Sequence, residues 1–470
     1  MEKELAEYAV EYASKLGANY AEARLQKSEG TSFLLKNGTP EISGFNEISG
    51  LGIRLIVEGG LSFVSTNQLH KPRIKTLVDK SFKAAKVVSK IKEQINLAED
   101  TPKQATYEVK QKIKIEDVAP SEKVGLLIEA DKAAVATGIK TAGRYLTLAD
   151  VTTTEYLVNS EGTKTLAKIP KVSFLYFITV QHGTKSMQRY WQYGNSGGFE
   201  FVKEWDLVKV VTDEIKICDF MLKKGKLVKP MKADLVVAPQ VVGIMVHESV
   251  GHPYEADRIL GREGAQAGES FVSPDMIGMQ IGSSAVTVVD DPTIPFSYGH
   301  YLYDNEGVKA RRKYLMKEGK ITEFLHNRQT AHKMGLTSNG SSRSVDYDKE
   351  SIVRMSNTVL LPGKYTEEEL IEGVKDGIFM KNFMEWNIDD KRIHQKYVGA
   401  EAYLIKNGKL EEPVSNATIE ISTYNLYKAV DAVANNTEYH SGNCGKGEPM
   451  QAIPVWFGGP SMRLRNLRVK

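Results

Sequence analysis

The 470-residue sequence contains only two cysteines, Cys218 and Cys444. Two cysteines cannot form the disulfide framework of a small secreted protein, and they favour a reducing compartment. The most apolar stretches, such as 235–246, are far shorter than the roughly 20 residues that a membrane-spanning helix requires. The N-terminus opens with mixed charges and lacks the apolar centre of a signal peptide. We therefore expect a cytoplasmic protein with no membrane segment.

The sequence also lacks an excess of either charge. There are 62 Lys and Arg residues against 59 Asp and Glu residues, a net charge of +3. This balance excludes the chain-wide basic character of many nucleic-acid-binding proteins, so no nucleic-acid partner is expected. Hydrophobic residues at 41% and charged residues at 26% are typical of a folded protein, and the length predicts two to four domains.

Hydrophobic periodicity predicts an N-terminal α+β domain over 1–95. Apolar residues recur at helical spacing over 3–16 and 71–94. Between these helices, Asn37-Gly38 and Glu58-Gly59-Gly60 each separate two strand-like stretches, which predicts two β-hairpins. Residues 96–106 have the composition of a linker.

A middle α+β domain is predicted over 107–230, with a helix at 120–137 and strands at 145–158 and 172–181. The remainder, 231–470, is predicted to be a mainly β C-terminal domain that carries a buried helix. That domain starts with a buried strand at 233–238, and Pro239 follows where a helix can begin. Further hairpins at Glu318-Gly319 and Asn407-Gly408, and a helix at 366–378 capped by Thr366, complete an α+β fold.

The predicted buried helix ends in titratable residues, His247-Glu248-Ser249-Val250-Gly251-His252. Two histidines and a glutamate are the components of a metallohydrolase, in which imidazoles hold Zn²⁺ and the carboxylate is a general base. In the common form of this motif the histidines stand at i and i+4. Here His247 and His252 stand at i and i+5.

This spacing is incompatible with a regular helix. Residues at i and i+5 lie roughly 140° apart around the helix axis, against about 40° for i and i+4. Gly251 permits a bulge, and Pro253 disfavours a helical conformation at His252. We therefore predict a local break or π-bulge at this point.

A catalytic zinc site normally has three protein ligands and one open position. From the residues alone, the third ligand is Glu255, Asp257 or a distant residue, of which Cys444 is the main candidate. Cys444 lies in a glycine-rich segment beside Lys446, which can help to hold the sulfur as thiolate. Cys218, by contrast, has the surroundings of a small buried hydrophobic residue.

Two other kinds of function remain open. Cys444 with His440, or with a motif histidine, can form the nucleophile and base of a thiol-dependent hydrolase. Alternatively, Glu255 or Asp257 closes a four-ligand structural metal site in a non-catalytic peptide-binding or assembly subunit. Tyr254 and His300 are candidates for stabilising an oxyanion.

Several ordered blocks of the sequence resemble the TldD/PmbA family of zinc metalloproteases, and specifically its TldD branch. The most specific block is 247–252, with Glu255 and Asp257 after it. The others are Asp290-Asp291-Pro292-Thr293, 303–308, 354–358, the segment from Cys444 to Gln451, and Gly458-Gly459-Pro460. Pro253, 380–390 and 447–450 depart from the family pattern without removing a candidate ligand.

The resemblance implies that His247, His252 and Cys444 hold one Zn²⁺ per chain and that Glu248 is the catalytic general base. It implies cleavage of peptides or unfolded protein segments, gripped by backbone pairing with a sheet edge. It also implies a dimer, formed either with a second copy or with a family member that lacks the motif.

Overall fold

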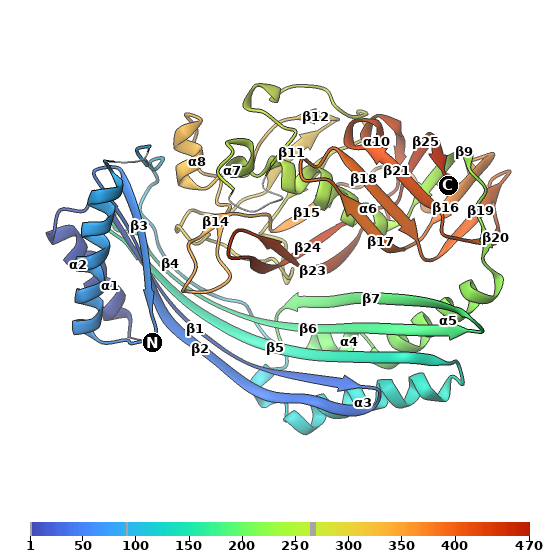
Figure 1. The fold of residues 1–470 in the computed structure, drawn as a ribbon, viewed down its shortest axis with the longest axis horizontal. Helices are drawn as coiled ribbons and strands as arrows, with labels where there is room; N and C mark the ends of the chain where they lie inside the picture. The colour runs from blue at the N-terminus through green and yellow to red at the C-terminus, as the bar shows by residue number, and fades with distance from the viewer. Residues whose placement is uncertain (1, 91–92, 264–268) are drawn as a thin grey trace.

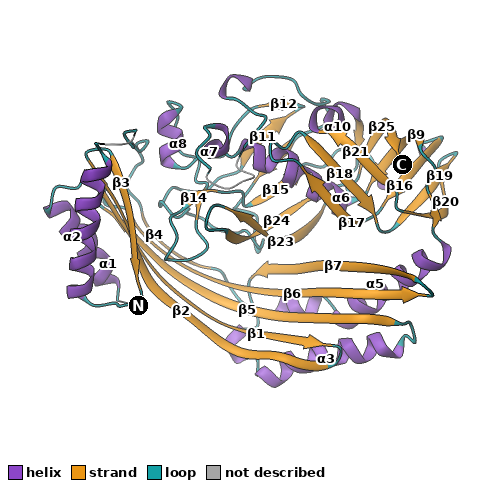
Figure 2. Cartoon of the chain, viewed as in Figure 1, coloured by secondary structure: helices purple, strands orange, loops and turns teal. Residues whose placement is uncertain are grey.

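The computed structural model describes residues 2–90, 93–263 and 269–470. The fold is α+β, as predicted. A long curved sheet from the N-terminal half forms one side of the molecule, and the mainly β C-terminal half lies within its curve (Figure 1). The N-terminal α1 (Lys3–Lys15) and α2 (Lys71–Val88) lie together at one end of this sheet (Figure 2).

The long sheet joins strands from both predicted N-terminal units. Its strand order is β3-β2-β1-β5-β6-β4. Strand β7 also pairs with β6, along residues 171–182, after the stretch 164–168 that pairs with β4. The strands are β1 (Tyr20–Lys36), β2 (Thr39–Val57), β3 (Gly60–Thr66), β4 (Gln104–Glu108), β5 (Thr141–Asn159), β6 (Lys164–His182) and β7 (Lys185–Ser196). The division into domains at 1–95, 107–230 and 231–470 stays a prediction. Strands on both sides of its first boundary share this one sheet.

Both predicted N-terminal hairpins are confirmed. Asn37 and Gly38 have φ values of 48° and 83°, the left-handed conformation that a two-residue hairpin turn requires. Glu58 and Gly59 adopt the same conformation between β2 and β3. The end of the expected linker is corrected, because its last residues belong to β4, which pairs in parallel with β6.

The helices of this half cover the two ends of the sheet. They are α1 (Lys3–Lys15), α2 (Lys71–Val88), α3 (Pro120–Ala136), α4 (Glu200–Glu204) and α5 (Leu207–Lys224). Helix α2 ends at Val88, earlier than its predicted end, and residues 91–92 lie outside the described residues. No helix within the described ranges is both long and apolar enough to span a bilayer.

The C-terminal half contains two larger sheets. The first has the order β12-β11-β10-β15-β24-β23, and the second has the order β17-β18-β21-β25-β9-β16-β19-β20-β8, with β22 on β25. These sheets include β8 (Lys226–Leu227), β10 (Val288–Asp290), β11 (Lys313–Lys317), β12 (Lys320–Ile321), β16 (Asp376–Met380), β19 (Ala402–Lys406), β20 (Lys409–Ser415), β21 (Thr418–Ser422), β22 (Val430–Val433) and β25 (Met462–Val469). The strands that bear on the site are β9 (Met231–Val237), β15 (Asn357–Leu360), β17 (Phe383–Ile388), β18 (His394–Gly399), β23 (Glu438–Lys446) and β24 (Gln451–Gly459). The predicted hairpins at Glu318-Gly319 and Asn407-Gly408 join β11 to β12 and β19 to β20.

The buried helix forms as the sequence predicts. Strand β9 ends at Val237, and Pro239 occupies the first turn of α6 (Pro239–Val246), where a missing N–H is harmless. Val241, Val242 and Met245 are fully buried, and α6 packs against β15, β23 and β24. This packing places the C-terminal end of α6 beside the β23–β24 hairpin. Helix α9 (Glu367–Glu372) is capped by Thr366 but is shorter than the predicted 366–378.

Candidate metal centre

The buried helix continues into a π turn, His247–Gly251. The N–H of His252 donates a hydrogen bond to the carbonyl oxygen of His247, which is the i→i+5 bond of a π-helix. This turn places residues five apart above one another, so the two imidazole rings lie edge to face with centroids 5.0 Å apart. The predicted break or π-bulge is therefore confirmed, and it removes the geometric obstacle of the i, i+5 spacing.

Glycine at the end of this turn allows close packing. A Cβ atom on Gly251 would lie 2.0 Å from Sδ of Met355 and 3.1 Å from Oγ1 of Thr358. Both neighbours are fully buried, so neither can move into solvent. The π turn can therefore press directly against β15 and the segment before it.

We expect Gly251→Ala to lower the free energy of unfolding by about 1–3 kcal/mol, because it overpacks this contact. The matched control is Gly125→Ala in α3, where an added Cβ meets nothing within 4 Å and alanine favours a helix by roughly 0.5–1 kcal/mol. The measurement is the midpoint of urea unfolding for the two variants and the wild type. An unchanged midpoint for Gly251→Ala would show that the packing tolerates a methyl group here.

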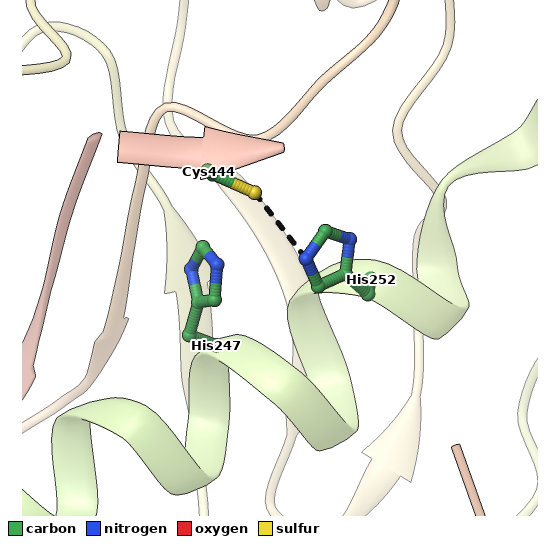
Figure 3. Close-up of side chains that lie close together, drawn as sticks. All are labelled: His247, His252 and Cys444. Atoms are coloured by element: carbon green, nitrogen blue, oxygen red, sulfur yellow. Dashed lines mark hydrogen bonds between the residues drawn. The ribbon is translucent and has the colours of Figure 1, made fainter. Parts of the chain in front are cut away.

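Three side chains converge where the π turn meets β23. Ligand atoms of His247, His252 and Cys444 all lie within 4.8 Å of one another, and all three residues are buried (Figure 3). Sγ of Cys444 is 3.3 Å from Nε2 of His252. Nδ1 of His247 is buried and has no hydrogen-bond partner in the described part of the chain, although buried nitrogens normally have one. Two imidazoles and a thiol, one with an unsatisfied nitrogen, are a donor set that suits Zn²⁺.

The two acidic residues considered as third ligands lie elsewhere. Oε2 of Glu255 is 3.0 Å from Nδ1 of His252, on the opposite side of the ring from Cys444. Asp257 accepts a hydrogen bond of 2.6 Å from Nζ of Lys446. Lys446 was expected to act on the sulfur, but its ammonium group pairs with these carboxylates instead. Within the described ranges, the cluster therefore contains three residues and no fourth.

Electrostatics favour the metal-binding forms of all three side chains. Burial alone raises the pKa of the Cys444 thiol, but His252 and Arg354 outweigh this effect and bring the pKa down to about 7. Burial lowers the pKa of His247 and of His252, which favours the neutral form of both imidazoles. Thiolate and neutral imidazole are the forms that coordinate a metal.

Glu248 lies beside the cluster and is paired with an arginine. Its Oε2 accepts a hydrogen bond of 2.7 Å from Nη1 of Arg392. Both residues line a cavity of about 530 Å³ that also contains the three clustered side chains. Sequence reasoning missed Arg392, since it lies 144 residues from Glu248 and no local pattern connects the two.

The two residues expected to stabilise an oxyanion are not part of this cavity. Tyr254 is fully buried and packs edge-on against Phe324, with ring centroids 6.0 Å apart. His300 lies in the loop after β10 (Val288–Asp290), and its N–H donates to the carbonyl oxygen of Ser297. Neither residue lines the cavity, so neither is placed to stabilise an oxyanion there.

His440 does not act on Cys444 in this structure. Its ring lies edge-on to Trp191 at a centroid distance of 5.3 Å, and burial lowers its pKa to about 4. Among the described residues, the only side-chain hydrogen-bond partner of the Cys444 sulfur is His252. The thiol-dependent alternative is therefore reduced to Cys444 with His252.

Three edge strands border the cavity. Strand β7 is at one edge of the long sheet, β23 ends the six-stranded sheet and β17 ends the ten-stranded sheet. Residues of each line the cavity, among them Tyr190, Asn443 and Phe383. The hydroxyl of Ser441 donates to the carbonyl of Gln192 at 2.9 Å, which ties β23 to the edge of β7.

Comparison with known proteins agrees with this combination of fold and site. Three domains described for the PmbA/TldA metallopeptidases match the chain in order: domain 1 over 21–85, the central domain over 113–216 and the C-terminal domain over 230–470. A metalloprotease of Methanocaldococcus jannaschii is 31% identical over 95% of this chain and 96% of its own length. A zinc metalloprotease TldD homolog of Saccharolobus solfataricus is 28% identical over 52% of this chain and 53% of its own length.

Solved structures share the whole fold. A Thermotoga maritima protein superposes with a TM-score of 0.80 at 16% identity over the full length of both chains. TldE from Thermococcus kodakarensis superposes with a TM-score of 0.77 at 16% identity, over 99% of each chain. At these identities the likeness shows the fold alone. The domain matches and the metalloprotease relatives define the class of protein as metallopeptidase-like. The chain belongs to the PmbA/TldA metallopeptidase family, which confirms the resemblance drawn from the sequence.

Proposed function

We propose that this protein is a zinc-dependent peptidase. His247, His252 and Cys444 would hold one Zn²⁺ per chain, and Glu248 is the general base. The observation that carries the proposal is the buried cluster of two imidazoles and a thiol within 4.8 Å, in a cavity shared with a carboxylate. Three ligands, with no fourth among the residues that the structure describes, leave the open position of a catalytic site, whereas a structural site is closed by four.

When bound, zinc supplies a Lewis acid that activates water and polarises a carbonyl group. The residues of the chain supply the proton transfers. Glu248 accepts a proton from the attacking water as the water oxygen bonds to the carbonyl carbon. The same carboxyl group then gives the proton to the leaving amine as the C–N bond breaks. Its position in the cavity, directly after His247 in the π turn, suits this role.

Glu255 contacts His252 on the side of the ring that points away from Cys444. An Nδ1–H donated from His252 to Glu255 leaves the lone pair of Nε2 directed toward Cys444, the tautomer that a metal ligand requires. Arg258 donates to the same carboxylate oxygen at 2.8 Å, which holds it in place. This carboxylate–histidine arrangement occurs in zinc enzymes and in thiol-dependent triads alike. The second imidazole of the cluster, His247, supports a metal site, because a cysteine–histidine–carboxylate triad has no use for it.

The substrate class we propose is peptides or unfolded protein segments. Edge strands β7, β17 and β23 present main-chain groups along the cavity, and an extended peptide can pair with such an edge with little sequence preference. The partner we propose is a second copy or a motif-lacking family member, and the site of action is the cytoplasm. The shared fold of this chain and TldE supports a family member as partner.

The experiment that tests the proposal is metal removal. We expect purified protein to contain about one zinc per chain and to cleave unfolded casein. Chelation should abolish cleavage, and stoichiometric zinc should restore it, because three ligands bind the ion within a folded site. Zinc absent even after resupply would contradict the proposal. Cleavage that survives complete zinc removal and stops on thiol alkylation would indicate the Cys444 nucleophile instead.

A further inference from the structure

Arg392 has features that ion pairing with Glu248 does not explain. It lies between β17 and β18 with a backbone φ of 65°, a left-handed conformation that non-glycine residues rarely adopt. Two contacts hold it there. Its N–H donates to the carbonyl oxygen of Asp389 at 3.0 Å, and Thr423 Oγ1 donates to the main-chain carbonyl oxygen of Arg392 at 2.7 Å. A backbone held in this way at a cavity is typical of a functional position.

The guanidinium group is only partly used. Nη1 donates to Glu248, whereas among the described residues the buried Nε has no partner and Nη2 makes no hydrogen bond. Buried donors are normally satisfied, so this arginine retains donors for a group that enters the cavity. Arg189, the other cavity arginine, is fully engaged by contrast: its Nε, Nη1 and Nη2 donate to Glu214, Phe383 and Gln240.

We infer that Arg392 is a catalytic residue that binds the oxygen of the scissile carbonyl group. This inference rests on the proposed peptidase function. As the water oxygen bonds to the carbonyl carbon, the π electron pair of the carbonyl moves onto its oxygen while Glu248 takes the proton. The free donors of Arg392 lie beside that base and hydrogen-bond the new negative charge. The pair returns to the carbon when the C–N bond breaks and Glu248 protonates the amine. A charged donor that is already in place stabilises this transition state strongly.

A free carboxylate at the end of a peptide offers the same guanidinium a similar oxygen. The structure favours the scissile carbonyl, because Arg392 contacts the general base itself, and the base must lie next to the attacked carbon. A group that binds the C-terminal carboxylate of a peptide would contact the substrate one residue beyond the scissile bond.

The test compares Arg392→Gln and Arg392→Lys with Lys391→Gln, which removes the neighbouring charge of an exposed pair with Glu269. The substrate is an internally quenched peptide built on a cleavage site mapped in casein, prepared as a free acid and as a C-terminal amide. Zinc content and binding of the phosphonamidate analogue of the same peptide are measured on every variant.

For Arg392→Gln we expect kcat to fall by about 10²–10³-fold on both peptides, with KM within about threefold and zinc content unchanged. Phosphonamidate affinity should fall by the same factor as kcat/KM, since both report transition-state binding. Arg392→Lys should recover part of the loss, and Lys391→Gln should match the wild type.

Several outcomes would overturn the inference. A loss confined to the free-acid peptide identifies a carboxylate anchor. A lower kcat with unchanged phosphonamidate affinity assigns Arg392 to positioning Glu248, and loss of zinc assigns it a structural role. If the wild type cleaves the peptide and Glu248→Gln does not, full activity in Arg392→Gln refutes the role of Arg392 and leaves the proposed function standing. If the wild type cleaves no peptide, the proposed function fails first and this role fails with it.

Discussion

Replacing Glu248 with glutamine is expected to lower kcat/KM for peptide hydrolysis by about 10²–10⁴-fold, the usual contribution of a general base. The amide cannot accept a proton from water, yet it has nearly the shape of the carboxylate and keeps an oxygen that can accept from Arg392. Zinc content should stay at about one per chain, because no proposed ligand is altered. The measurements are initial rates on the quenched peptide and elemental analysis of the same samples.

The matched control is Glu420→Gln, which removes an exposed carboxylate paired with Lys470, outside the cavity. It should leave both the rate and the zinc content unchanged. Hydrolysis by Glu248→Gln at the wild-type rate would remove Glu248 as the base and, with zinc still bound, would favour a non-catalytic metal. A loss of zinc in this variant would instead show that the carboxylate supports the metal site directly.

The local geometry of the site could be predicted from the sequence because backbone rules decide it. Two histidines five residues apart, with glycine before the second and proline after it, fit a π turn and exclude a regular helix. The structure has that turn at His247–Gly251. The hairpin at Asn37-Gly38 was predictable for the same kind of reason, because few residue pairs accept two consecutive positive φ angles.

The long-range pairings could not be predicted in this way. Strand β1 pairs in register with β5, Glu22 opposite Asn159, although these residues lie in different predicted units. Hydrophobic alternation shows that a segment is a strand but does not show which strand it joins. The same limit applies to Arg392 and Glu248, whose contact depends on the β17–β18 loop folding over the π turn.

The surroundings of Cys444 show how a distant ligand is fixed in place. Arg354 has no exposed surface, and it donates to the main-chain carbonyl groups of Cys444 and Gln451 on the paired strands β23 and β24. The arginine therefore fixes the hairpin at the point where the sulfur faces His252. In the sequence the 354–358 block was notable only for its family resemblance, because its partners lie about 90 residues away.

Cys444→Ser is expected to reduce zinc content from about one per chain to a small fraction after dialysis against a weak chelator. Cysteine binds a metal as its thiolate, whereas a serine hydroxyl remains protonated at neutral pH. In Cys444→Ser only the two imidazoles would therefore hold the ion. Removing a residue that only hydrogen-bonds a metal ligand lowers metal affinity about 10–100-fold. Removing a ligand itself should lower the affinity for zinc by at least as much. Peptide hydrolysis should fall in parallel with zinc content.

Cys218→Ser is the matched control, because Cys218 is the only other cysteine and is also buried. Its sulfur contacts Glu214 at 3.8 Å, and burial raises its pKa, so it remains a thiol and should not influence zinc. Excess zinc separates the two roles of Cys444. If the sulfur is a ligand, added zinc refills the weakened site in Cys444→Ser and restores part of the activity. If the sulfur is the nucleophile, the bond-forming atom is gone, and zinc restores nothing at any concentration.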